Sequence, residues 1–147
     1  MPLRDVALTD ASVLETASLA EAVAALFATR VPAIAVLDDA GRVLGILSER
    51  EVLGAVFPGY LGEIRHSAFL TDDASALDEL AARARDRPVR DFMRTSEVLE
   101  LSDSQIHAAE RLMHSGDDAL PVVDGGRFVG MLSVAGLCHA RLDRIPE

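Results

Sequence analysis

An internal duplication limits the possible folds of this chain more than any other feature of the sequence. Pro2–Asp5 (PLRD) recurs as Pro88–Asp91 (PVRD), and Ala33–Asp38 (AIAVLD) recurs as Ala119–Asp124 (ALPVVD), both at an offset of about 86 residues. The match continues through Gly126–Ser133 at an offset of about 85 residues, so one turn has lost a residue. Because the matches run in order through segments of different character, we expect two copies of one structural unit.

Each copy has the pattern of a helix, two strands and a second helix. Ser18 and Glu21 fit a capping box at the start of the first helix, and the turn residues after Leu37 predict a hairpin. One sheet of so few strands cannot cover itself, so two copies packed face to face would form an α/β (α+β) pair. The apolar helix face is Leu19, Ala22, Val23, Leu26 and Phe27; the strands are 33–37 and 42–47; Val52, Leu53, Val56 and Phe57 mark the second helix; the second copy gives 106–113, 120–123, 128–132 and a helix from about 134.

The segment between the copies is longer than an ordinary connection. We divide the chain into a first repeat at 1–57, an insert at 58–87 and a second repeat at 88–147. Apolar spacing in the insert predicts two short helices, one marked by Leu61, Ile64 and Ala68 and the other by Leu77, Leu80, Ala81 and Ala84.

The composition disfavours several classes of partner without excluding them. A net charge of −10 disfavours nucleic acid and anionic lipid, since both are bound through clustered Lys and Arg. No apolar stretch approaches the roughly 20 residues that span a bilayer. With Cys138 as the one cysteine and no secretory leader, we expect a cytoplasmic protein.

The strand-to-helix junctions of the two repeats carry similar motifs. They are Gly45–Glu51 (GILSERE) in the first repeat, and Leu120–Asp124 (LPVVD) with Gly130–Ser133 (GMLS) in the second. These segments resemble the CBS domain, a family named for cystathionine β-synthase. The stretch from Phe57 to Leu70 is also similar to free-standing bacterial proteins with two CBS repeats. The resemblance implies two repeats related by an approximate twofold axis, two clefts between them, a homodimer, and no catalysis. It also implies an adenosyl ligand such as AMP, ADP, ATP or S-adenosylmethionine, and an effector protein that the sequence does not identify.

The family motif is Gly, two apolar residues, Ser or Thr, two variable residues and Asp. By this resemblance Ser48 takes the hydroxyl position beside a phosphate, and Glu51 takes the acidic position that binds the ribose hydroxyls. Glu51 is one methylene longer than the usual Asp, and Ser48 with Glu51 is also a capping box that needs no ligand. In the second repeat Ser133 keeps the hydroxyl position, as a ligand contact or only a helix cap, but Gly136 replaces the acid.

Three further residues are candidates for the nucleotide site. Ile34 and Leu120 stand where the family has apolar walls around adenine, although both also suit a plain core position. Arg50 could approach a phosphate, or it could be a solvated partner of its acidic neighbours.

Other chemistry has little support in the sequence. The histidines and Cys138 lack the close spacing of a zinc site, and neither G-x-S-x-G nor a Walker loop is present, so we predict no metal site and no enzyme. We interpret the acidic pairs at 38–39, 72–73 and 117–118 as solvated turns. Two hypotheses remain: a sensor with an adenosyl ligand at Ser48 and Glu51, or a constitutive dimerisation or docking platform that uses the stretch 60–70.

Overall fold

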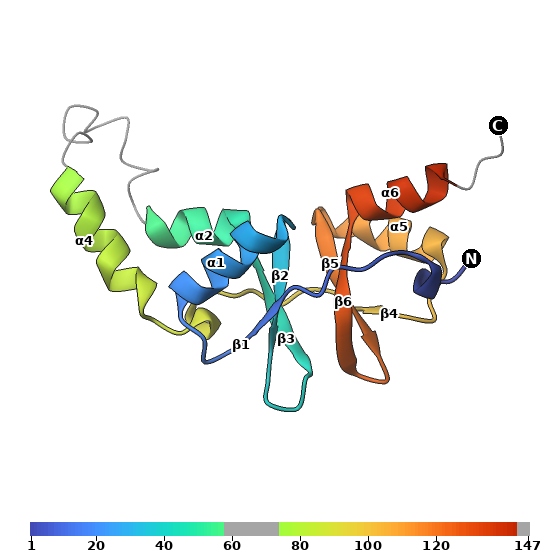
Figure 1. Cartoon of the computed structure of the whole chain (residues 1–147), viewed down its shortest axis with the longest axis horizontal. Helices are drawn as coiled ribbons and strands as arrows, with labels where there is room; N and C mark the ends of the chain where they lie inside the picture. Colours follow the sequence, from blue (N-terminus) through green and yellow to red (C-terminus); the bar gives the residue numbers. More distant parts are fainter. Residues whose placement is uncertain (58–73, 144–147) are drawn as a thin grey trace.

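The two repeats form a mixed α/β structure with two three-stranded sheets at its centre (Figure 1). The computed structural model describes residues 1–57 and 74–143. The predicted order of helix, strand, strand and helix is confirmed in both repeats, and the second predicted helix of the insert is α4, whereas the first falls outside the described residues. The elements are η1 (Leu3–Asp5), β1 (Ser12–Leu14), α1 (Leu19–Thr29), β2 (Ala33–Leu37), β3 (Val43–Ser48), α2 (Glu49–Val56), α4 (Ala74–Arg85), η3 (Val89–Asp91), β4 (Leu99–Glu100), α5 (Gln105–Ser115), β5 (Ala119–Asp124), β6 (Arg127–Ser133) and α6 (Val134–Leu142).

The two sheets have the same topology. In each, an antiparallel hairpin is extended by a short strand parallel to the hairpin's first strand, giving the orders β1-β2-β3 and β4-β5-β6. Both hairpins change register at the corresponding point, between Val36 and Leu37 in the first and between Val122 and Val123 in the second. The duplication seen in the sequence therefore extends to a local irregularity of the backbone.

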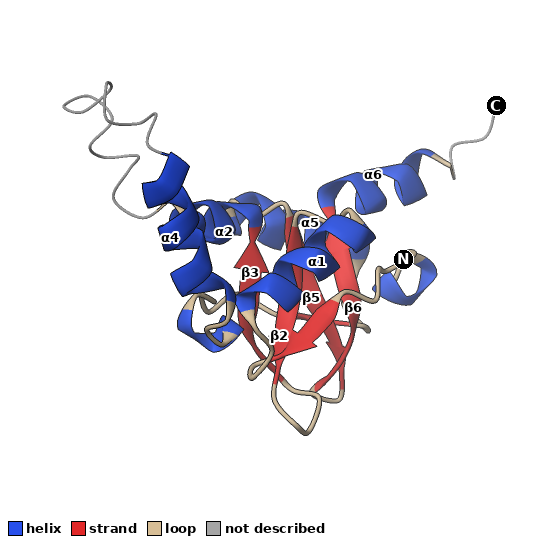
Figure 2. Ribbon diagram, turned by 60° about the vertical axis from the view of Figure 1, so that its left-hand side comes forward, coloured by secondary structure: helices blue, strands red, loops and turns tan. Residues whose placement is uncertain are grey.

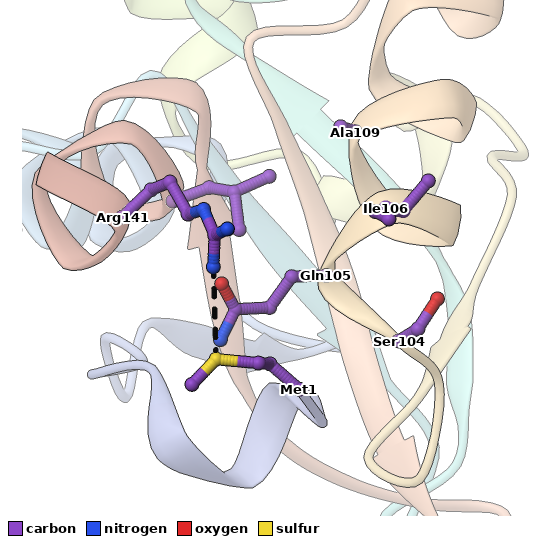
Figure 3. A pocket seen from close by; sticks show the side chains of 7 residues that line it. Met1, Ser104, Gln105, Ile106, Ala109 and Arg141 are labelled. Atoms are coloured by element: carbon purple, nitrogen blue, oxygen red, sulfur yellow. Dashed lines mark hydrogen bonds between the residues drawn. The ribbon is translucent and has the colours of Figure 1, made fainter. Parts of the chain in front are cut away.

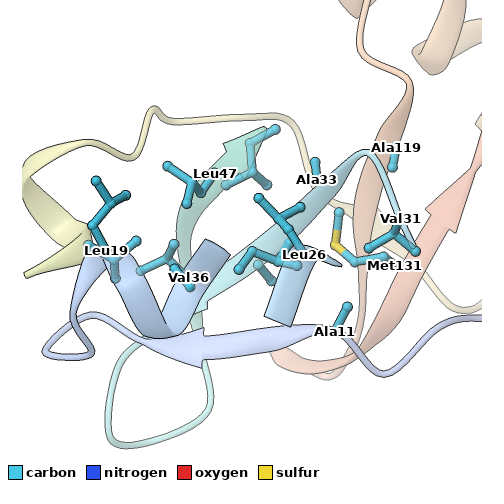
Figure 4. Close-up of a cluster of buried hydrophobic side chains, with 14 of the residues drawn as sticks. Ala11, Leu19, Leu26, Val31, Ala33, Val36, Leu47, Ala119 and Met131 are labelled. Carbon is cyan, nitrogen blue, oxygen red and sulfur yellow. The ribbon is translucent and has the colours of Figure 1, made fainter. Parts of the chain in front are cut away.

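The cores of the two repeats are in contact through their sheets. β2 contacts both β5 and β6, and the hairpins lie beside one another with the helices along one side of them (Figures 1 and 2). The cluster around β2 includes Ala119 and Met131 from the second repeat (Figure 4). Each repeat thus buries its sheet against the other, which a lone three-stranded sheet could not do.

The start of each repeat packs on the other repeat. Leu3 is fully buried in the cluster of the second repeat, and its backbone N–H donates to the carbonyl of Asp103 at 2.9 Å. Val89 is likewise buried in the cluster of the first repeat, with its N–H donating to the carbonyl of Ala17 at 2.7 Å. This reciprocal crossing ties the repeats into one unit.

The motif glycines make room for these crossing segments. A Cβ on Gly45 would collide with the carbonyl oxygen of Arg94, and a Cβ on Gly130 would lie 2.6 Å from the Cβ of Leu8. Arg94 exchanges two backbone hydrogen bonds with Ile46 across this approach, at 2.9 and 3.0 Å. Only glycine allows the backbones to come this close.

The helices begin as predicted, but their apolar faces are only partly buried. Ser18 caps α1 by accepting from the Glu21 N–H at 3.1 Å, and the Glu21 carboxylate accepts from the Ser18 N–H at 3.4 Å. The prediction that Phe27 lies on the buried face is wrong, because it is 87% exposed. No residue of α2 is buried, and Leu53, which we expected on an apolar face, is exposed.

Candidate functional site

The predicted pair Ser48 and Glu51 lies where β3 passes into α2. One oxygen of the Glu51 carboxylate, Oε1, accepts from the backbone N–H of Ser48 at 3.0 Å and from its hydroxyl at 2.6 Å. The pair therefore does act at the start of the helix, as the capping interpretation requires. Only Oε1 takes part in these two contacts, so they leave Oε2 available.

Arg94 connects this helix start to the second repeat. Its Nε lies 3.2 Å from Glu51 Oε1, and its Nη2 forms an ion pair with the carboxylate of Asp117, just before β5. Asp117, through its hydrogen bond, raises the pKa of Arg94 above the usual value, and the charges of Asp117 and Glu51 act in the same direction against the effect of burial. One guanidinium thus holds two carboxylates from different repeats.

These side chains surround a cleft of about 360 Å³ between the repeats. It carries four carboxylates, from two residues of α2 and two of the turn before β5, against the two guanidinium groups of Arg50 and Arg94. The lining residues are Pro32, Ala33, Ser48, Glu49, Arg50, Glu51, Arg94, Gly116, Asp117, Asp118 and Ala119. The excess of two negative charges opposes the binding of highly anionic molecules.

The other candidates from the sequence lie at different depths. Arg50 is exposed and lines the cleft, as the prediction of a phosphate contact needs. Ile34 and Leu120 are fully buried in the two core clusters, and neither lines the cleft. Their neighbours Ala33 and Ala119 line it instead, because alternate residues of a strand point to opposite faces.

The corresponding place in the second repeat is built differently. Ser133 caps α6 by accepting from the N–H of Gly136 at 2.9 Å. A hollow of about 450 Å³ next to it is mostly apolar, and the first turn of α6 brings no carboxylate to it. Its lining residues are Arg30, Val31, Pro32, Asp118, Ser133, Val134 and Ala135. The two clefts therefore share the helix cap and differ in charge.

The ion pair that joins the repeats at the first cleft, between Arg94 and Asp117, was not predicted from the sequence. Arg94 lies between the repeat motifs, and nothing in its neighbours indicates that it reaches Glu51. The interpretation of Asp117 as a solvated turn residue is wrong, because its side chain is only 10% exposed and is ion-paired. A comparison of the two repeats could have drawn attention to Asp117. Asp117 and Asp118 stand in the second repeat where the first repeat has the apolar residues Val31 and Pro32.

The described residues contain neither a cluster of metal ligands nor a helix that could span a membrane. Within residues 1–57 and 74–143, no three His, Cys, Asp or Glu side chains are grouped so as to hold a metal ion. Cys138 is exposed, and His66 falls outside the described residues. None of the described helices has the length and apolar character needed to cross a membrane.

The fold and the cleft define a class: a duplicated α/β unit whose strand-to-helix junction faces a polar space between the repeats. The family model of the CBS domain matches residues 3–58 and again 89–143. The chain belongs to the CBS domain family and carries two CBS repeats. None of the curated proteins compared with it matches significantly.

Solved structures give the same fold. A CBS domain-containing protein of unknown function from Kribbella flavida is 20% identical with a TM-score of 0.79, covering 97% of this chain and 99% of its own. The CBS domain of a membrane protein from Sphaerobacter thermophilus is 21% identical with a TM-score of 0.74, covering 95% and 87%. CBSX2 from Arabidopsis thaliana in complex with AMP is 21% identical with a TM-score of 0.64, covering 97% and 92%.

Proposed function

We propose that the chain is a regulatory module that binds an adenosyl compound carrying at most one phosphate in the cleft of Ser48 and Glu51. The observation that carries the proposal is the Glu51 carboxylate, which faces the cleft with one oxygen held by the Ser48 backbone and hydroxyl. A carboxylate fixed in this way suits the two hydroxyls of a ribose, which donate hydrogen bonds. No catalytic role is proposed.

The rest of the cleft supports a nucleoside with a small anionic group. The Glu49 N–H already donates to the carbonyl of Pro32 at 3.1 Å, so the place for one phosphate is the Arg50 guanidinium in the first turn of α2, at the positive end of the helix. Ala33 and Ala119 are small apolar residues, so they leave space for a flat base between the repeats. That CBSX2 was solved with AMP agrees with this ligand class but is a property of that protein.

The charge of the cleft sets a limit on the ligand. Four carboxylates against two guanidinium groups make each added phosphate less favourable. We therefore expect ATP to bind more weakly than AMP, and S-adenosylmethionine, whose sulfonium is cationic, to be accepted without that penalty. The proposed site therefore binds AMP more tightly than ATP.

Binding at this cleft would also change the contact between the repeats. A ribose on Glu51 or a phosphate near α2 competes for groups that Arg94 now holds, so the Arg94 bridge to Asp117 responds to the ligand. A ligand that favours one arrangement of the bridge shifts the population of that arrangement. An effector protein would read this shift.

A thermal-shift panel with AMP, ADP, ATP, adenosine and S-adenosylmethionine tests the proposal. A ligand at 100 times its dissociation constant stabilises the fold by about 2.7 kcal/mol, which is a rise in Tm of about 5–10 °C at this chain length. We expect this rise with AMP or S-adenosylmethionine, a smaller one with ATP, and none in Glu51→Ala.

Ser133→Ala is the matched control, because it removes a helix-cap serine from the other cleft. It should lower Tm without changing the ligand-induced rise. If no compound of the panel raises Tm at 5 mM, or if Glu51→Ala responds like the wild type, the proposed site is wrong.

The alternative function, a constitutive dimerisation platform, also has one observation in its favour. Phe27 and Met113 occupy equivalent places in α1 and α5, and they are 87% and 84% exposed. Large apolar side chains so exposed in both repeats suit a homodimer contact. The predicted contact stretch 60–70 lies outside the described residues. Light scattering of the double variant Phe27→Glu/Met113→Glu separates the two functions. The platform is favoured if the wild type is dimeric, the double variant is monomeric, and no compound of the thermal-shift panel raises Tm.

A further inference from the structure

A second pocket lies at the far end of the second repeat, between α5 and α6. It has a volume of about 300 Å³ and lies away from the cleft of Ser48, with no lining residue in common. Its walls are mostly apolar, and two polar side chains, Gln105 and Arg141, point into or across it (Figure 3). The lining residues are Met1, Ser104, Gln105, Ile106, Ala109, Leu137 and Arg141.

The amide of Gln105 is buried in this pocket without a hydrogen-bond partner. The residue is only 6% exposed, and within the described part of the chain neither Oε1 nor Nε2 has a partner. Its backbone is fixed, because the Gln105 N–H donates to the carbonyl of Met1 at 2.8 Å. Leaving both the donor and the acceptor of a buried amide unpaired is unfavourable, so such a group needs an explanation.

The first repeat shows that this position does not need a polar residue. The equivalent of Gln105 is Leu19, a core residue that is 2% exposed. There, α4 packs against both α1 and α2 (Figure 2). Among the described elements, none covers α5 and α6 in the corresponding way. The second repeat therefore has an open groove, and a carboxamide replaces the leucine at its base.

We propose that this pocket binds a small molecule that presents a lactam or carboxamide edge to Gln105 and a carboxylate to Arg141. A primary amide offers one acceptor and two donors, so it pairs with a ligand edge that carries a donor next to an acceptor. The Arg141 guanidinium, whose Nη1 lies 3.6 Å from the sulfur of Met1, is placed to pair with an anion at the rim. Leu137, Ile106 and Ala109 supply the apolar walls for a flat ring.

Composition provides a direct observable for this site. The chain contains no asparagine and a single glutamine, Gln105, so the side-chain NH₂ pair in a ¹H–¹⁵N spectrum belongs to this residue alone. The probes are orotate, which has both a lactam edge and a carboxylate, uracil, which lacks the carboxylate, and benzoate, which lacks the lactam edge. Each is titrated to 10 mM into the full chain.

We expect orotate to shift the Gln105 NH₂ pair in a saturable way and to bind at least tenfold more tightly than uracil or benzoate. Gln105→Leu, which restores the residue found in the first repeat, should fold and weaken orotate binding at least tenfold, as followed by backbone amides of α5 and α6. Arg141→Met should reduce orotate to the affinity of uracil. Glu51→Ala is the control from the other cleft and should leave orotate binding unchanged.

Two outcomes would overturn the proposal. In one, the NH₂ pair does not move with any probe, or Gln105→Leu binds orotate like the wild type. In the other, the chemical shifts of the Gln105 NH₂ pair change with protein concentration and not with added probe, because a second copy of the chain covers the pocket. Neither outcome bears on AMP binding at Glu51, which the thermal-shift panel measures separately.

Discussion

The two clefts of this CBS pair are built on the same backbone and carry different side chains. In the first, Glu51 on α2 and Asp117 before β5 are joined through Arg94. In the second, Gly136 stands on α6, and Val31 takes the place of Asp117. The serine N-caps, the hairpin irregularities and the motif glycines occur in both repeats. Duplication has thus kept what the backbone needs and left the cleft chemistry free to diverge.

This comparison predicts that the largest effects come from residues that both repeats share. Gly45→Ala places a Cβ against the backbone carbonyl of Arg94, which cannot turn away as a side chain would. We expect a loss of about 3 kcal/mol in the free energy of unfolding, by analogy with overpacked cores, and a fall in Tm of about 6–12 °C. Thermal or urea unfolding followed by circular dichroism measures it.

Gly130→Ala tests whether the equivalent crossing in the second repeat is equally strict. Its new Cβ would lie 2.6 Å from the Cβ of Leu8, an atom that cannot rotate away from its own backbone, so we expect a loss of about 2–3 kcal/mol, close to that of Gly45→Ala. Gly54→Ala is the control, because a Cβ there meets nothing within 4 Å, and it should stabilise α2 slightly. Equal effects of all three changes would show that the crossing segments do not depend on the glycines.

The next largest effect should come from the bridge that only the first cleft has. Arg94→Met leaves the carboxylates of Glu51 and Asp117, 20% and 10% exposed, without their shared cation. We expect a loss of about 1–3 kcal/mol at neutral pH, measured by urea unfolding. Thr9 makes the equivalent backbone pairing with Met131, so Thr9→Val is the matched control and should cost about 0.5 kcal/mol or less.

A double-mutant cycle sharpens the assignment of that loss to the bridge. If Arg94 acts mainly through Asp117, then Asp117→Asn should make the Arg94→Met change much less costly, and the two effects should not add. Additive effects would mean that the stability contributed by Arg94 arises elsewhere, for instance from packing of its aliphatic stem.

Much of the fold could be predicted because local rules and the duplication agree. Helical spacing around Leu19, the hairpin turn after Leu37 and the cap serines Ser48 and Ser133 each predicted an element that the structure contains. The short strands β1 and β4 could not be predicted, since three and two residues carry no usable alternation. The crossing of Leu3 and Val89 to the opposite repeats is a tertiary arrangement that no local pattern encodes.

The candidate site was predictable only where its residues lie close together in the sequence. Ser48 and Glu51 are three residues apart, so their contact is visible in the sequence. Arg94 meets Glu51 across 43 positions, and the contact exists because the start of the second repeat crosses beneath Gly45. Asp117 reaches the cleft because it lies just before β5, which packs against β2 and β3. Charge patterns alone gave Asp117 the interpretation of a surface turn, because they contain no information on which turn faces which helix.

The smallest predicted effect comes from adding to the second cleft the acid that it lacks. Gly136→Asp replaces a helical glycine and places a carboxylate next to the capping Ser133, with the new Cβ 3.0 Å from the flexible serine hydroxyl. We expect a gain of about 0.5–1 kcal/mol in the free energy of unfolding, from lower chain entropy and a favourable charge at the helix start. Gly136→Ala is the control for the glycine effect alone.

The same variant tests whether the missing acid is what separates the two clefts in function. If AMP binds in the first cleft, calorimetric titration should give one site per chain in the wild type and Gly136→Ala, and two in Gly136→Asp. A single site in all three would mean that the acid is not sufficient, and that the apolar wall of Val31 and Val134 also prevents binding. The divergence of the clefts would then lie in their shape as well as their charge, and Val31→Asp, which copies Asp117, would be the change needed with Gly136→Asp to obtain a second site.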